Sequence, residues 1–190
     1  MRTSVCWTNW QGQGLERCTL VQDDEHLILE GVVSGTRGGK YGAYYSVRAD
    51  AQCRTREVLV KYIGGQTLHV LADGDGHWHD ILGDRSVPSL DGCFDVDIGV
   101  TPATNTLAIK RLGLAPKARQ DIVAAYVPLP SQIEGAFLPV PAQQRYTCLI
   151  VDRRYRYEGL FRSFKAELEL DRFGLVMDYP DTFRRVEETS

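Results

Sequence analysis

The fold of this protein is decided by the stretch LDGCFDVDIGVTPATNTLAIKRL, residues 90–112. Between residues 94 and 100 apolar side chains alternate with carboxylates, a period of two that is typical of a strand with one buried and one polar face. Asp95 and Asp97 share the polar face, where they are a candidate reactive pair or ion-pair partners for nearby arginines. The opposite face is predicted to carry Phe94, Val96, Ile98 and Val100.

The second half of this stretch changes direction and then becomes apolar again. Thr101 precedes Pro102, which favours an extended backbone, so we expect a bend rather than the start of a helix. Residues 104–106 carry hydroxyl and amide groups that commonly bond the backbone in turns. Residues 107–112 are then predicted to resume the sheet, which makes the whole stretch a structural corner.

Most of the remaining chain is predicted to form strands separated by Gly, Asp-Gly and Pro turns. Residues 121–127 are apolar at almost every position, as in a strand covered on both faces. A last short helix is predicted at residues 182–188, capped by Asp181. The sequence therefore predicts a mainly β protein, one domain over residues 1–190, with a long antiparallel sheet that curls or closes.

Composition narrows the class of protein. Hydrophobic residues make up 43% and charged residues 25%, as in an ordinary globular domain, and a net charge of −3 gives no general attraction to nucleic acid. The five cysteines are widely spaced with no C-x-x-C pair, which favours a reducing compartment. No stretch approaches the roughly 18 apolar residues of a membrane span. We expect a cytoplasmic protein without a membrane span.

Two arginines stand out in the strand predicted near residues 53–62. Arg54 and Arg56 fall on the same face as Val58 and Val60. If that face is interior, the guanidinium groups need carboxylates, carbonyls or a ligand. The alternative is that both arginines meet water where the strand leaves the core.

A metal or cofactor is not predicted. His77 and His79 share a strand face, but no third ligand stands at a telling spacing. The Asp-Gly-Asp-Gly run at residues 73–76 lacks the calcium-loop frame of an EF-hand. Trp78, on the face opposite the histidines, is expected to be a packing anchor.

Residues 90–112 resemble the signature of the glycolipid-binding family, a bacterial group long carried as a domain of unknown function. The family pattern runs approximately L-D-G-C-x-D-V-D-I and then T-P-x-T-N-T-L-P-I-R-R-L. Similar segments are CRTREV, DGDGHW, QRYTCL, YRY and GLVMDYP. Ala108 stands where the pattern has proline, and Lys110 stands where it has arginine, which keeps the charge but loses the bidentate fork.

The resemblance implies a spiral β-roll, in which a long antiparallel sheet wraps around a single helix, and a homodimer. The family label itself rests on likeness to bacterial lipoprotein carriers that hold acyl chains in a half-open barrel. That is an argument from fold, so it strengthens the fold prediction more than the functional one. It carries no catalytic or ligand residue across to this chain.

The first functional hypothesis is a carrier or sensor for an amphipathic ligand such as a glycolipid, held in an apolar-lined cavity of the roll. Aromatic side chains can stack on sugar faces, and charged or amide groups can bond hydroxyls or a phosphate. The candidate aromatic residues are Trp7, Trp78, Tyr146, Tyr155 and Tyr157. The candidate polar residues are Arg54, Arg56, Asp95, Asp97, Asn105 and Arg145.

Two alternatives remain open. The first is a hydrolase in which Asp95 and Asp97 act as acid and base, with burial raising one pKa. No nucleophile elbow, cysteine–histidine pairing or phosphate loop accompanies them, so a non-enzyme is expected. The second is a dimeric interaction module whose roll is filled by its own side chains and has no cavity of ligand size.

Overall fold

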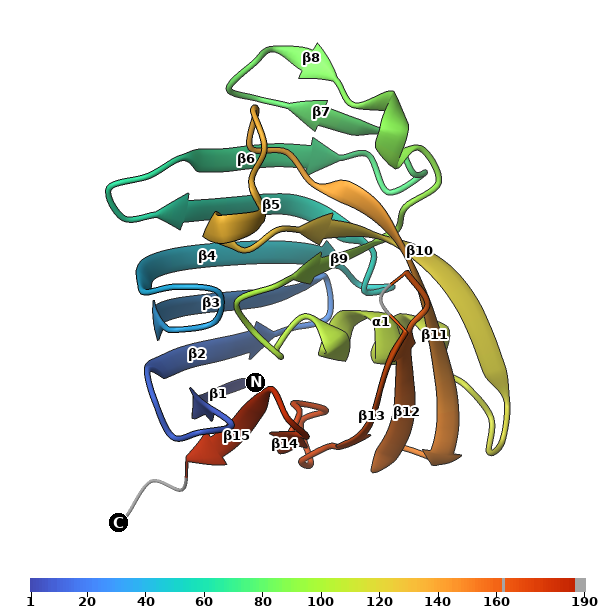
Figure 1. The fold of residues 1–190 in the computed structure, drawn as a ribbon. Coiled ribbons are helices and arrows are strands. Elements are labelled where there is room, and N and C mark those ends of the chain that lie inside the picture. Colours follow the sequence, from blue (N-terminus) through green and yellow to red (C-terminus); the bar gives the residue numbers. More distant parts are fainter. Residues whose placement is uncertain (162, 187–190) are drawn as a thin grey trace.

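The computed structural model describes residues 1–161 and 163–186. Strands dominate these residues and form two curled sheets with one short α-helix between them (Figure 1). The strands of the larger sheet form one wall of the roll, and β10 to β13 form the facing wall (Figure 1). This arrangement confirms the prediction of a mainly β, curled roll around a single helix.

The larger sheet has ten strands in the order β14-β15-β1-β2-β3-β4-β5-β6-β7-β8, with antiparallel neighbours. The end of the chain returns to its beginning, because β15 pairs with β1. The bounds are β1 (Arg2–Asn9), β2 (Leu15–Gln22), β3 (His26–Gly35), β4 (Tyr41–Asp50), β5 (Thr55–Tyr62), β6 (Thr67–Ala72), β7 (Trp78–Asp80), β8 (Arg85–Ser86), β14 (Asp178–Tyr179) and β15 (Phe183–Val186).

The inner face of the larger sheet follows the alternation in the sequence. In β4, Ala43, Tyr45 and Val47 are buried, since every second residue of a strand faces the core. Tyr45 lies opposite Gly31 of β3 in the register. A Cβ atom at Gly31 would lie 2.5 Å from the Tyr45 ring. Glycine at this position therefore leaves the space that the Tyr45 side chain fills.

The smaller sheet has the order β13-β12-β11-β10-β9, and it contains one parallel pair, β9 with β10. The roll is therefore built from two sheets, one of them mixed, rather than from one continuous antiparallel sheet. The bounds are β9 (Asp95–Ile98), β10 (Arg119–Val127), β11 (Val140–Ile150), β12 (Arg154–Gly159) and β13 (Phe164–Glu169), with short 3-10 helices at Pro88–Leu90 and Pro130–Gln132.

The prediction that residues 107–112 resume the sheet is wrong, because Asn105–Leu112 forms helix α1. Every residue from 105 to 109 is buried, so this segment lies inside the roll and not along a sheet edge. A helix bonds its own backbone groups there, as burial requires. It ends where Gly113 adopts a left-handed conformation (φ 51°) and donates its N–H to the Ile109 carbonyl.

The predicted C-terminal helix is also wrong over the residues that the structure describes. Phe183–Val186 forms β15 and pairs with β1, so tertiary pairing overrides the local helix signal. Asp181 has a φ of 62° and stands in a turn instead of capping a helix. Residues 187–188 of the predicted helix lie outside the described residues.

Two further features concern the residues that the structure describes. Within residues 1–161 and 163–186, no helix has the length and apolarity needed to cross a membrane. All five cysteines are free, and four of them are buried, where a thiol packs as a small apolar side chain.

Candidate functional site

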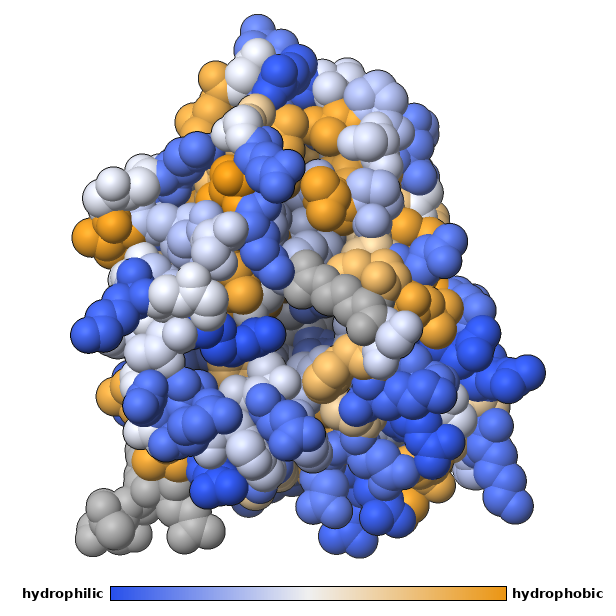
Figure 2. All heavy atoms as spheres, in the orientation of Figure 1, coloured by the Kyte–Doolittle hydropathy of each residue, from blue (hydrophilic) through white to orange (hydrophobic). Residues whose placement is uncertain are grey.

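A cavity of about 320 Å³ lies between the two sheets. Figure 2 shows the molecule from the same side as Figure 1, and its surface is hollowed near the centre. The cavity combines aromatic rings with a carboxylate, a guanidinium and hydroxyl groups of threonine and tyrosine, and we call it the aromatic pocket. Its lining is Arg37, Asp97, Ile98, Gly99, Thr101, Tyr126, Tyr157, Gly159, Phe161, Phe164, Tyr179, Thr182 and Phe183.

One wall of the aromatic pocket is a cluster of four rings from β12 to β15. The Tyr179 ring centroid lies 5.9 Å from that of Tyr157, 5.7 Å from that of Phe164 and 6.3 Å from that of Phe183. These separations fit tilted and edge-to-face ring contacts. Burial raises the pKa of Tyr179 well above its usual value, so its hydroxyl stays neutral and can donate a hydrogen bond.

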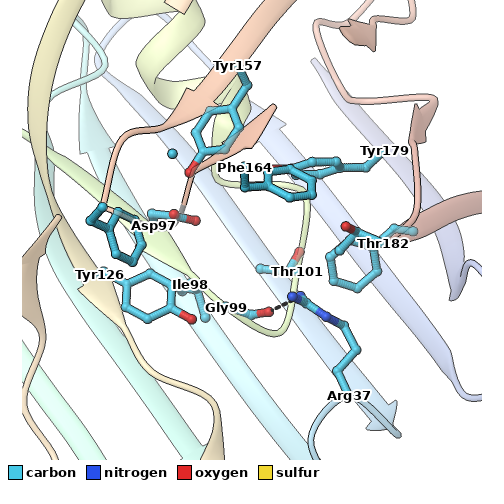
Figure 3. Close-up of a pocket in the computed structure, with 13 residues that line it drawn as sticks. Arg37, Asp97, Ile98, Gly99, Thr101, Tyr126, Tyr157, Phe164, Tyr179 and Thr182 are labelled. Carbon is cyan, nitrogen blue, oxygen red and sulfur yellow. Dashed lines mark hydrogen bonds between the residues drawn. The ribbon is translucent and has the colours of Figure 1, made fainter. Parts of the chain in front are cut away.

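The carboxylate of the pocket is Asp97, which the parallel pairing of β9 with β10 places opposite Tyr126. Buried Gln144 of β11 donates its Nε2–H to Asp97 Oδ2 over 2.6 Å. This bond orients the carboxylate. The hydroxyl of Tyr157 is turned toward the same side of the pocket as Asp97 (Figure 3).

The guanidinium of the pocket is Arg37, from the turn between β3 and β4. Its Nη1 donates to the Gly99 carbonyl oxygen over 2.6 Å, drawn as the dashed line in Figure 3. Its Cζ lies 5.1 Å from the centroid of the Phe183 ring. Two contacts thus hold a fixed positive charge at the pocket, and a guanidinium has further donors for a ligand.

A buried acid lies behind the pocket wall. Thr101 lines the pocket and donates its hydroxyl to Glu16 Oε1 over 2.5 Å, and the Tyr45 hydroxyl donates to the same oxygen over 2.6 Å. Glu16 is 2% exposed, and its Oε2 is buried with no hydrogen-bond partner among the described residues. Burial raises the pKa of Glu16 to about 8 despite these two bonds. The carboxyl is therefore protonated at neutral pH.

Two of the residues predicted from the sequence, Asp97 and Tyr157, line the pocket. Two more lie directly behind the ring cluster. Tyr146 is buried with its ring centroid 5.4 Å from that of Tyr157, and its hydroxyl donates to Asn105 Oδ1 of α1 over 2.9 Å. Tyr146 and Asn105 thus join the pocket wall to the helix without lining the cavity themselves.

The three predicted arginines lie away from the pocket. Arg54 donates to Asp50 Oδ2 over 2.9 Å, and the Nη1 of Arg56 lies 3.7 Å from the same oxygen. Both are half-buried at the beginning of β5, which fits the alternative in which they meet water outside the core. Arg145 forms a bidentate ion pair with Asp121 on the outside of the smaller sheet.

Asp95 is not a solvated residue on an outer face. It is 1% exposed, and Arg111 of α1 donates to both of its oxygens over 2.8 and 2.6 Å. Burial raises the pKa of Asp95, and the Arg111 guanidinium opposes that rise. The prediction of an arginine partner is confirmed for Asp95, whereas Asp97 accepts a hydrogen bond from Gln144. The lining of the aromatic pocket includes Asp97 and not Asp95, so the two carboxylates of the hydrolase hypothesis do not share its wall.

The predicted tryptophans and Tyr155 are buried in the core. Trp7 donates its Nε1–H to the Val176 carbonyl, and Trp78 donates to the Cys93 carbonyl. Trp78 therefore packs as the anchor expected of it. The Tyr155 hydroxyl accepts a hydrogen bond from the backbone of Asp152.

The two histidines predicted on one strand face each contact a separate acid. His77 Nδ1 lies 2.8 Å from an oxygen of Asp73, and His79 Nε2 lies 3.3 Å from one of Asp84. Among residues 1–161 and 163–186, no group of three His, Cys, Asp or Glu side chains is placed to hold a metal ion.

Several pocket residues were missed because their signals lie in separate segments. Arg37 adjoins Gly38-Gly39, a dipeptide that by itself indicates only a turn. Tyr179 stands in the GLVMDYP segment that was quoted for the family, yet nothing local points it at Asp97. Phe183 was placed on a predicted helix. Only the pairing of β15 with β1 brings it beside Arg37.

Comparison with known proteins identifies a family and a similar solved structure. A family model described as "Putative glycolipid-binding" matches residues 4–185. The chain belongs to this family. It is similar to a crystal structure of a DUF1089 family protein from Pseudomonas aeruginosa, with 38% identity, a TM-score of 0.76 and 92% of each chain covered. No curated protein matches the chain.

Proposed function

We propose that this protein is a carrier or sensor that binds an amphipathic ligand, with a sugar head group in the aromatic pocket. The observation that carries the proposal is the pocket itself, a cavity of about 320 Å³ in which ring faces surround a carboxylate, a guanidinium and hydroxyls. Ligand sites are typically mostly apolar concavities with a few placed polar groups. The dimeric module with a filled roll predicts no such cavity.

The chemistry of the lining suits a sugar. The C–H faces of a pyranose pack on aromatic rings such as Tyr157 and Tyr179. Its hydroxyls both donate and accept, so they need acceptors and donors together. Asp97 supplies an acceptor and Arg37 supplies donors. The description of the family model as glycolipid-binding supports the same ligand class.

The proposal is tested by native mass spectrometry of gently purified protein, combined with thermal shifts in a panel of octyl glycosides. The panel is the octyl glycosides of glucose, galactose, mannose, N-acetylglucosamine and maltose, each below its micelle concentration. We expect a co-purifying lipid or a concentration-dependent rise in Tm with at least one glycoside. No co-purifying lipid and no shift across the panel would remove the proposal.

Asp97→Asn is expected to weaken glycoside binding by about tenfold, because a hydrogen bond to a charged group is stronger than one to a neutral amide. Asparagine keeps the oxygen that accepts from Gln144, so the fold should be retained. The matched control is Asp121→Asn, which changes a carboxylate on the outside of the same sheet. Equal affinities for both variants in titration calorimetry would exclude Asp97 from the ligand site.

The homodimer and the cytoplasmic location remain predictions of the family resemblance and the cysteine pattern. Sedimentation velocity of the full chain tests the dimer. A concentration-independent monomer across the micromolar range would contradict it.

A further inference from the structure

A second cavity, of about 530 Å³, follows the segment that connects β10 to β11. We call it the apolar groove. Apart from Tyr126, Gln132 and Glu134, its described lining residues have apolar side chains. The lining is Tyr126, Pro128, Gln132, Ile133, Glu134, Ala136, Leu138, Val140, Pro141, Ala142 and Phe161. In Figure 2 apolar side chains gather in the upper centre of the view, above the hollow.

The shape of the apolar groove is fixed by contacts on both sides of the connecting segment. At one end the Tyr62 hydroxyl donates to the Pro128 carbonyl over 2.7 Å. Further along, the Phe137 ring stacks on Tyr62 with centroids 5.1 Å apart. Between them, the Gln132 side-chain oxygen accepts bonds from the Tyr126 hydroxyl and the Leu129 N–H. These contacts fix the segment between β10 and β11 in place, and with it the shape of the groove.

Two large apolar side chains of the groove are exposed to solvent. Val140 is 50% exposed and Phe161 is 44% exposed. Val140 pairs with Tyr126 across β10 and β11, so both side chains point to the same side of the sheet. Contiguous exposed apolar side chains around a concavity are typical of a binding surface.

The two cavities are adjacent. Tyr126 and Phe161 line both of them, and their ring centroids lie 5.8 Å apart. The ring pair of Tyr126 and Phe161 is therefore common to both cavities. The aromatic pocket has a carboxylate and a guanidinium. The apolar groove has the Glu134 carboxylate and no guanidinium or ammonium among its described lining residues. One molecule with a polar and an apolar end can occupy both.

We propose that the apolar groove binds the hydrocarbon chain of the ligand, with the chain passing the Tyr126–Phe161 ring pair. This rests on the proposed function, because it assigns the second half of a ligand whose sugar lies in the aromatic pocket. The shared Tyr126 and Phe161 walls and the mostly apolar lining of the groove favour an alkyl chain as the occupant. The described lining offers no guanidinium or ammonium to an anion.

The test compares methyl, hexyl and octyl glycosides of the five sugars in the panel by titration calorimetry with the full chain. Each methylene buried in the groove should tighten binding about two- to fourfold, as expected for partly to fully buried CH₂ groups. Val140→Asp should abolish this dependence on chain length and leave the affinity for the methyl glycoside unchanged. Aspartate is chosen because it has no aliphatic stem that could replace the lost apolar contact.

The matched control is Val123→Asp. Val123 is a 40% exposed valine of β10, and it alternates with Tyr126 and Ala124 so that it faces the other side of the sheet. This variant should keep the full dependence on chain length. Circular dichroism of both variants checks that each is folded.

The outcomes separate this inference from the proposed function. If no methyl or octyl glycoside binds, the proposed function fails and the groove assignment falls with it. If methyl and octyl glycosides bind equally well, or if Val140→Asp and Val123→Asp reduce the chain dependence equally, the groove assignment alone is overturned. A change of oligomeric state in Val140→Asp with unchanged chain dependence would identify a second copy of the chain as the occupant instead.

Discussion

Arg111→Met is expected to lower the free energy of unfolding by about 3–5 kcal/mol, the range found when one partner of a buried ion pair is removed. The variant leaves the Asp95 carboxylate buried between β9 and α1 without the two donors that now reach its oxygens. Methionine keeps most of the side-chain volume, so the loss reports on the charge and not on a cavity. Urea denaturation at neutral pH measures it.

Two controls sharpen this result. Arg145→Met breaks a bidentate pair of the same chemistry on the outside of the smaller sheet, and exposed pairs add little stability. It should leave the denaturation midpoint almost unchanged. Combining Asp95→Asn with Arg111→Met should recover part of the loss, because no unpaired charge remains. A loss below about 1 kcal/mol for Arg111→Met would show that Asp95 is not held by this pair.

Glu16→Gln is expected to remove a pH-dependent loss of stability. The pKa of Glu16 rises from 4.5 to about 8 in the folded protein. A raised pKa means that the folded state holds the proton more tightly than the unfolded state. The stabilisation from the protonated Glu16 is therefore fully present below pH 4.5 and is lost as the pH rises to 8. Between pH 4.5 and 8, the free energy of unfolding of the unchanged protein should therefore fall by about 3–5 kcal/mol more than that of Glu16→Gln.

The variant isolates Glu16, because glutamine keeps an oxygen that accepts from Tyr45 and Thr101. The buried neighbours Cys18 and Tyr45 do not ionise in this window. Burial raises the pKa of Cys18 to about 12 and that of Tyr45 well above 10. The measurement is urea denaturation of both proteins at intervals from pH 4.5 to 8.5. Parallel curves over this range would mean that Glu16 is ionised in the folded protein.

The strands could be predicted from the sequence because their signals are local. The alternation in residues 94–100 and the apolar run in residues 121–127 predict strands, and the structure has β9 (Asp95–Ile98) and β10 (Arg119–Val127) there. Helix α1 and strand β15 could not be predicted in the same way. The apolar positions of residues 107–112 fit either structure, and burial inside the roll decides for the helix. Residues 183–186 become a strand only because β1 offers an edge.

The site was harder to predict than the fold. Asp97 and Tyr157 were selected from their residue types, and they line the pocket. Arg54, Arg56 and Arg145 were selected in the same way, yet their ion pairs lie elsewhere. The pocket draws on turns and strand ends far apart in the sequence, such as Arg37 and Tyr179. Their convergence depends on the curl of the sheets, which no local pattern records.

The central claim is that one amphipathic molecule occupies the aromatic pocket and the apolar groove together. Crystals of the full chain soaked with the tightest-binding octyl glycoside test it most directly. We expect difference density for a sugar ring against Tyr157 and Tyr179, with the alkyl chain continuing past Tyr126 into the groove. A glycoside bound anywhere else, or both cavities without it at saturating concentration, would contradict the account.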